Sequence, residues 1–223
     1  GTMEADAYTL GGASFIKVEG TNFTDSLIIG HATTGTLDAA QYNTGVGLTS
    51  LDAITSGDNN TAVGYDSGTA LTTGSYNSFI GAGSGRACAT GTENAAVGRF
   101  SQYHVSNGSY NTSIGSGALT GASGQSNHSN TAIGNNALQV ISTGEYNIGI
   151  GRNSGNNITS GDGNVVIGNA DVSSATGDDQ LSISDGKDGA VVWMTGDSSA
   201  KLTFPGALQV SGAVTVGVDD TGL

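Results

Sequence analysis

Residues that could carry out chemistry are few in this sequence. Its closest acidic pairs are Asp178-Asp179, Asp185-Asp188 and Asp219-Asp220. Two carboxyl groups held about 5 to 9.5 Å apart across a cleft can hydrolyse a glycosidic bond. These pairs, however, lie among glycine and serine in segments typical of turns, where aspartate supports the turn and its solvation. The acids of the central region share no recurrent position, so we expect no enzymatic activity.

Histidine and cysteine give no stronger signal. His31, His104 and His128 are too dispersed to predict a nucleophile with its base or a three-ligand metal site. The single cysteine, Cys88, excludes an intrachain disulfide and a paired-cysteine metal site. Its position is filled by isoleucine, leucine or valine elsewhere in a repeat described below, which predicts core packing. We expect no cofactor. A structural ion such as calcium is an alternative without an assigned site, since the calcium-binding nonapeptide spacing is absent.

Charge and hydropathy exclude two classes of partner. The 223 residues contain 6 basic and 19 acidic side chains, a net charge of −13. Counterion release from phosphates therefore cannot drive binding to nucleic acid. No run approaches the roughly 18 apolar residues that span a bilayer, so we expect no membrane insertion.

A repeat of 17 residues organises the chain, and asparagine marks it. The asparagines that recur are Asn43, Asn60, Asn77, Asn94, Asn111, Asn130, Asn147 and Asn164. One step is 19 residues long because of two extra residues within 121–129. Each asparagine is followed three residues later by valine or isoleucine and four residues later by glycine. An earlier unit, Ser26–Gly30, fits with serine in place of asparagine.

The second half of six units has its own glycine, fourteen residues after the asparagine, with an apolar residue three positions before it; the unit that begins at Asn111 is interrupted there. Glycine is too frequent for helices, and the short apolar runs between turn residues favour strands. A single unit cannot bury its apolar face, so the units should stack as a parallel β-solenoid of about nine coils and roughly 40 Å. Stacked asparagines can then pass amide hydrogen bonds along the axis. We expect this structural role rather than ligand binding for the asparagines.

Alternation along the strand predicts how each unit is oriented. We expect the valine and isoleucine positions to face the interior, and the small residues one position earlier, such as Gly45, Ala62 and Ala96, to face outward. A surface of small apolar residues favours close lateral packing against copies of the same chain. Tyrosine precedes the asparagine in every second unit, which predicts a packing column. Its members are Tyr42, Tyr76, Tyr110 and Tyr146.

Runs such as Asn60–Gly64, Asn130–Gly134 and Asn164–Gly168 resemble the repeats of trimeric autotransporter adhesin heads, and more closely those of bacteriophage tail fibres. The resemblance covers residues 26–172. It implies a left-handed parallel β-roll that forms a homotrimer and attaches a virion to its host. The commonest adhesin-head repeat is nearer 14 residues than 17. The expected function is structural support and recognition of a host-surface glycan or protein, in an extracellular tail fibre. The alternative is an adhesin head on a bacterial surface.

The flanking regions differ from the repeats. Residues 1–25 contain an alternating run that predicts a leading strand, and residues 1–3 are interpreted as a cloning scar. Residues 173–223 contain short alternating runs separated by glycine and aspartate, which predict brief strands. The tract 204–217 is similar to fibre shaft segments that precede a self-cleaving chaperone.

Recognition is expected where units depart from the repeat, because recurrent positions form the scaffold. Aromatic and basic side chains replace small corner residues at one place, and an insertion marks another. The candidate receptor-binding residues are Arg99, Phe100, Tyr103, His104, Asn127 and His128. A third interpretation of the chain is an ice-binding solenoid, because threonine shares one position in several units. That column, however, is broken by Ser78, Ala95, Ile148 and Val165.

Overall fold

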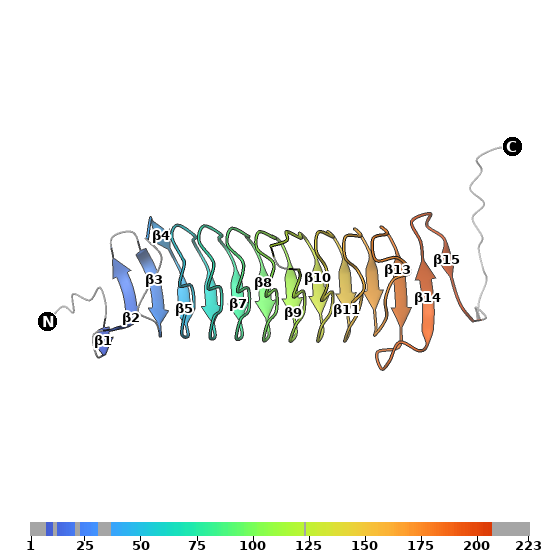
Figure 1. Cartoon of the computed structure of the whole chain (residues 1–223), viewed down its shortest axis with the longest axis horizontal. Coiled ribbons are helices and arrows are strands. Elements are labelled where there is room, and N and C mark those ends of the chain that lie inside the picture. Colours follow the sequence, from blue (N-terminus) through green and yellow to red (C-terminus); the bar gives the residue numbers. More distant parts are fainter. Residues whose placement is uncertain (1–7, 11–12, 21–22, 31–36, 123, 207–223) are drawn as a thin grey trace, which may run out of the picture.

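The computed structural model describes residues 8–10, 13–20, 23–30, 37–122 and 124–206. In this part of the chain all regular structure is β-strand, and the strands form one long sheet (Figure 1). The strands are β1 (Tyr8–Leu10), β2 (Ala13–Gly20), β3 (Phe23–Ile29), β4 (Ala40–Gln41), β5 (Thr44–Val46), β6 (Thr61–Val63), β7 (Ser78–Ile80), β8 (Ala95–Val97), β9 (Thr112–Ile114), β10 (Thr131–Ile133), β11 (Ile148–Ile150), β12 (Val165–Ile167), β13 (Leu181–Ser184), β14 (Val192–Gly196) and β15 (Leu202–Thr203).

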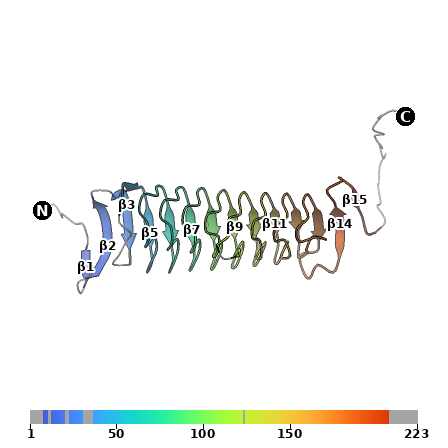
Figure 2. The same cartoon turned by 45° about the horizontal axis from the view of Figure 1, so that its top comes forward.

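The centre of the molecule is a parallel β-solenoid. Strands β5 to β12 lie side by side in strict register, so that each residue faces its equivalent one repeat away. Each coil contributes one three-residue strand, and the remainder returns through turns to the start of the next strand (Figure 2). The predicted solenoid of about 17-residue coils is thereby confirmed. Parallel pairing also continues through β13, past residue 172, where the sequence repeat ends.

Antiparallel strands stand at both ends of the rod. Strands β1 and β2 pair antiparallel before β3, and β14 and β15 pair antiparallel after β13. The leading strand expected near the N-terminus is β2. Residues 1–3 lie outside the described residues, as does the shaft-like tract beyond residue 206. The end strands cover the edges of the solenoid, which would otherwise offer unpaired backbone groups to other chains.

Side-chain amides of the recurrent asparagines form a continuous chain of hydrogen bonds along the axis. In a representative coil, the Asn60 backbone N–H and its Nδ2 both donate to Asn43 Oδ1 at 3.0 Å, and Nδ2 also donates to the Gly74 carbonyl at 3.0 Å. The same arrangement recurs up to Asn164. Gln180 extends it by one coil, because its N–H and Nε2 donate to Asn164 Oδ1. Each buried asparagine amide from Asn60 to Asn164 is hydrogen-bonded in this series, which is why the position varies so little within the sequence.

The two recurrent glycines are needed for different reasons. Glycine after the strand, as at Gly64, has a φ of +134° and lies against the next coil, where a Cβ would be 2.7 Å from the Gly81 carbonyl carbon. Such a φ is unfavourable for any residue with a side chain. Glycine in the second half, as at Gly74, has no positive φ. A Cβ there would lie 2.2 Å from the Gly91 carbonyl oxygen. The second column therefore reflects close backbone approach.

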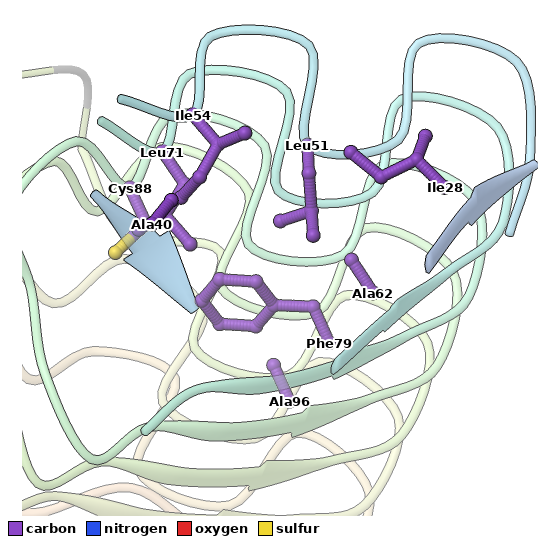
Figure 3. Close-up of a cluster of buried hydrophobic side chains, with 9 residues drawn as sticks. All are labelled: Ile28, Ala40, Leu51, Ile54, Ala62, Leu71, Phe79, Cys88 and Ala96. Carbon is purple, nitrogen blue, oxygen red and sulfur yellow. The ribbon is translucent and has the colours of Figure 1, made fainter. Parts of the chain in front are cut away.

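The prediction of which strand residues face inward was wrong. The central residue of each strand is buried, including Ala62, Phe79 and Ala96, whereas the valine or isoleucine after it is exposed on the outer face. The interior is completed by the apolar column of the second half, and Figure 3 shows Ile54, Leu71 and Cys88 on successive coils.

Available space explains this orientation. The coil interior is narrow, so large and small residues must alternate. Phe79 fits because Gly68 and Gly85 lie against its ring, where a Cβ would come within 3.1 Å and 2.5 Å of ring carbons. A large branched residue at the central position of every strand would overfill this interior.

The apolar core is interrupted near the middle of the rod. One buried cluster extends from Ile28 to Ala96 and a second begins at Ala118. Between them lie the buried side chains of Gln102, Ser113 and Asn127. The amide groups of Gln102 and Asn127 have no hydrogen-bond partner among the residues that the structure describes. The interruption coincides with the 19-residue repeat, so the two extra residues are accommodated at the expense of apolar packing.

Candidate recognition site

Four of the predicted site residues come together on one corner of the solenoid. The Phe100 and Tyr103 rings meet edge to face with centroids 4.8 Å apart, and Tyr103 and His104 meet similarly at 4.6 Å. The Arg99 guanidinium carbon lies 4.0 Å from the centroid of the Phe100 ring. This geometry is that of a cation–π contact. We call Arg86, Arg99, Phe100, Tyr103 and His104 the arginine–aromatic cluster.

Arg86 belongs to this cluster although the sequence analysis did not select it. Its guanidinium carbon lies 5.3 Å from the centroid of the Tyr103 ring. The two residues are separated by 17 positions and so occupy the same place on adjacent coils. That offset was the signal that could have identified Arg86. The cluster therefore contains two of the six basic residues of the chain.

The backbone at Phe100 is unusual for an aromatic residue. Its φ is +59°, at a corner where other coils have Asp66, Gly83 or Asn136. Left-handed backbone costs about 1–2 kcal/mol for most residues, while glycine, asparagine and aspartate adopt it more readily. Gly83 lies directly beneath the aromatic pair, and a Cβ there would be 2.7 Å from Phe100 and 3.0 Å from Tyr103. Glycine at position 83 thus leaves space for the two rings, although the positive φ at Phe100 is unfavourable for an aromatic residue.

Charge is unevenly neutralised in the cluster. Arg86 Nε lies 3.5 Å from Asp66 Oδ2. Arg99 is exposed and has no carboxylate partner among the residues that the structure describes. Phe100, Tyr103 and His104 are half-buried. The cluster therefore presents partly exposed ring surface beside an unpaired guanidinium, a combination suited to a sugar that carries a carboxylate or other acidic group.

The other two predicted site residues have structural roles. Asn127 is fully buried, so its candidacy as a surface recognition residue is wrong; its carbonyl accepts a hydrogen bond from Asn111 Nδ2 at 2.9 Å, as a glycine does in other coils. His128 Nδ1 accepts the backbone N–H of Ser109 at 3.2 Å. Among the described residues, no hydrogen bond or ring contact joins His128 to the arginine–aromatic cluster. The insertion therefore preserves the solenoid hydrogen bonds at its C-terminal side.

His128 is one member of a second polar column that the sequence analysis missed. A side chain at this position accepts a backbone N–H from the preceding coil in most units. Examples are Asp58 with Gln41, Ser75 with Asp58, Ser109 with Thr92, Asp162 with Glu145, and Asp178 with Asp162. Asp58 and Asp162 therefore share a recurrent position, so the expectation that the central acids share none was wrong. Asp178, one of the acids considered above for catalysis or solvation, is likewise an acceptor for a backbone N–H group.

The outer sheet face carries an uninterrupted apolar column. We call it the outer Val/Ile stripe, and its residues are 36 to 44% exposed. Its members are Val46, Val63, Ile80, Val97, Ile114, Ile133, Ile150 and Ile167. In-register pairing places them at one strand spacing, so the stripe is about 34 Å long. A contiguous apolar strip of this length is typical of an interaction surface.

Other chemical sites are not apparent in the described part of the chain. No group of three or more histidine, cysteine or acidic residues is placed to hold a metal ion there. A search of the same residues for helices long and apolar enough to cross a membrane found none. His31 lies outside the described residues.

The fold places the protein in the class of β-solenoid repeat proteins. Comparison of the chain with protein-family models, with curated proteins and with solved structures gave no match.

Proposed function

We propose that this chain is a non-enzymatic segment of a phage tail fibre that forms a homotrimeric rod and binds the surface of the host cell. The observation that carries the proposal is the outer Val/Ile stripe. Eight large apolar side chains face outward in one line, although the sheet could have placed polar residues there. A partner with the same repeat would match the stripe coil by coil, and another copy of this chain is such a partner.

The trimer rests also on the repeat pattern, which resembles that of trimeric fibres and adhesin heads. Association through the stripe would remove valine and isoleucine side chains from water along most of the rod. Burial of apolar area contributes about 25 cal/mol per Å² before the cost of association, so a contact repeated over eight coils can hold slender rods together.

Host recognition is assigned to the arginine–aromatic cluster. It departs from the repeat, it holds an unpaired guanidinium, and its rings are partly accessible. The ligand class it fits best is an acidic glycan, because the sugar can lie against Phe100 or Tyr103 while Arg99 contacts its negative group. This positive cluster is local in a strongly acidic chain, which would disfavour acidic polymers elsewhere on the surface.

The decisive experiment on the assembly is the solution mass of the purified chain by light scattering. A mass of three chains at micromolar concentration supports the proposal, and a stable monomer contradicts it. Recognition is tested separately by binding of the fluorescently labelled protein to host cells and to isolated host glycans.

For recognition, the Arg99→Ser variant is expected to reduce host binding at least tenfold, because the charged contact is removed. Serine occupies the equivalent corner at Ser116, so the backbone should be unaffected. Arg152 is at the same corner three coils away from Arg99, and Arg152→Ser is the matched control. Equal binding by wild type and both variants would contradict the assignment.

Two other functions give different outcomes. An adhesin head on a bacterial surface would share the trimer and differ in its full-length gene, which would encode a secretion signal and a membrane anchor. Ice binding has one structural observation in its favour: Thr44, Thr61, Thr112 and Thr131 lie on the same outer face as the stripe. Thermal hysteresis by the purified protein would support it.

A further inference from the structure

The tyrosine column lies on the corner where each coil enters its strand. Tyr42, Tyr76, Tyr110 and Tyr146 are 55 to 63% exposed, so they do not form the packing column within the chain that their spacing suggested. No ring pair or hydroxyl hydrogen bond joins them to other residues that the structure describes. Successive members are two coils, or about 9.6 Å, apart, which is beyond the range of ring–ring contact.

These tyrosines occupy an unfavourable backbone conformation. Their φ values are between +57° and +62°. A bulky residue in the left-handed region is uncommon, and asparagine or glycine would remove about 1–2 kcal/mol of strain at each position. Asn59 and Gly163 show that the same corner accepts those residues. Four strained and exposed rings, without a ring pair or hydroxyl hydrogen bond among the described residues, indicate that their role lies outside the chain.

The residues between the tyrosines are polar. Asn59, Glu93 and Ser129 occupy the corner in the intervening coils. Rings and hydrogen-bonding groups therefore alternate at a spacing of about 4.8 Å. Beside the Tyr76 ring is a shallow hollow of about 480 Å³, lined by Tyr76, Ser78, Glu93, Asn94 and Ala95. The Glu93 carboxylate is unsuited to an interface between protein chains that excludes water, because burying an unpaired charge costs free energy.

We infer that the tyrosine column binds an extended neutral polysaccharide lying parallel to the rod axis. The apolar faces of sugar rings would stack on the tyrosines, and the hydroxyl groups between them would donate to Asn59, Glu93 or Ser129. The distance between tyrosines is comparable to a disaccharide repeat in an extended β-1,4-linked chain. Acidic polymers are disfavoured by Glu93 and by the net charge of −13. This site is distinct from the arginine–aromatic cluster, for which we propose an acidic glycan.

The test uses the assembled protein and two probe series, cello-oligosaccharides and N-acetyl-chito-oligosaccharides of increasing length. Binding is measured by isothermal titration calorimetry. Affinity for at least one series should rise as the oligosaccharide becomes long enough to contact two tyrosines, and again for three. Malto-oligosaccharides, which coil instead of extending, should bind at least tenfold more weakly. Absence of binding to both extended series would overturn the inference.

The variant Tyr76→Asn/Tyr110→Asn should lose at least tenfold in affinity for the long oligosaccharides while remaining folded, since Asn59 already occupies this corner. The matched control is Tyr65→Asn. Tyr65 is 57% exposed on another corner, where Asn135 and Asn169 stand in later coils. Unchanged affinity in the double variant would overturn the inference.

Light scattering of the same variants separates this site from subunit contacts. A loss of assembly in Tyr76→Asn/Tyr110→Asn, but not in Tyr65→Asn, would mean that the rings pack between chains, and the inference would be wrong. The Arg99→Ser variant should keep its oligosaccharide affinity and lose binding to host cells. Either proposed site can therefore be refuted without refuting the other.

Discussion

At the scale of single residues, the corners of the solenoid separate structure from recognition. Positive φ values recur at fixed places in the coil, and asparagine, aspartate or glycine, which adopt them readily, fill some units at each place. Phe100 and Tyr76 stand where the backbone disfavours them. Such departures from local preference are expected at functional sites, since their cost is retained only where a side chain is needed.

Cys88 gives a prediction at this scale. Burial raises the pKa of its thiol from the ordinary 9.0 to about 12, and a contact with the Gly91 carbonyl accompanies it. Between these pH values the unfolded thiol loses its proton and the folded thiol keeps it, so the unfolded state binds fewer protons. The free energy of unfolding should therefore fall as pH rises from 9 to 12, by up to about 1.4 kcal/mol per pH unit.

The measurement is chemical denaturation of wild type and Cys88→Val across this pH range. Valine already fills the equivalent position at Val105. Other groups titrate in both proteins, so the difference between them isolates the thiol. Identical pH dependence would contradict the prediction. The folded wild type should also resist thiol reagents, because the reactive thiolate is disfavoured.

At the scale of structural elements, the repeat made the solenoid predictable and left the orientation of its strands ambiguous. Regular spacing required stacked coils, and stacking required the asparagine hydrogen bonds. Both the large and the small strand residues are apolar, so alternation alone could not decide which face is inside. The large Phe79 ring faces inward because Gly68 and Gly85 leave room for it. Predicting that orientation requires knowing which residues meet across the coil. The contact of Arg86 with Tyr103, by contrast, joins equivalent positions one repeat apart, so the repeat itself could have predicted it.

The interrupted core predicts a stabilising substitution. Gln102 is fully buried, and neither of its amide atoms has a partner in the described part of the chain. Its position is filled by Leu51, Leu119 and Leu138 in other coils with similar positive φ. Gln102→Leu should raise the free energy of unfolding by about 1–3 kcal/mol, because an unsatisfied buried polar group is removed.

Urea denaturation measures this effect, with Gln139→Leu as the control. Gln139 is only half-buried, so its substitution should change the free energy of unfolding by no more than about 0.5 kcal/mol. A lower free energy of unfolding for Gln102→Leu than for the wild type would contradict the prediction.

At the scale of the whole molecule, the rod presents distinct surfaces along its length. The outer Val/Ile stripe follows the sheet face, the tyrosine column follows a corner beside it, and the arginine–aromatic cluster is confined to a few coils on another corner. A solenoid can separate assembly and binding in this way because each position in the coil generates its own line of side chains.

The stripe predicts the effect of a charge at its centre. Ile114 is 44% exposed and lies near the middle of the line. In the proposed trimer, Ile114→Glu would bring three carboxylates into an apolar contact, so the solution mass should fall to that of one chain while the far-ultraviolet circular dichroism spectrum is retained. The control is Val140→Glu, a residue 42% exposed but outside the stripe. An unchanged mass for Ile114→Glu would exclude the stripe as the contact between copies.

The asparagine hydrogen bonds also give the rod an electrical direction. Every Nδ2 from Asn60 to Asn164 donates toward the N-terminal coil before it, so these side-chain amide dipoles point the same way. Dipoles aligned head to tail reinforce one another. The N-terminal end of the interior is therefore the positive end, and the series finishes there at the hydroxyl of Ser26, which accepts the Asn43 N–H. Two such rods placed side by side are electrically equivalent only when they run in the same direction.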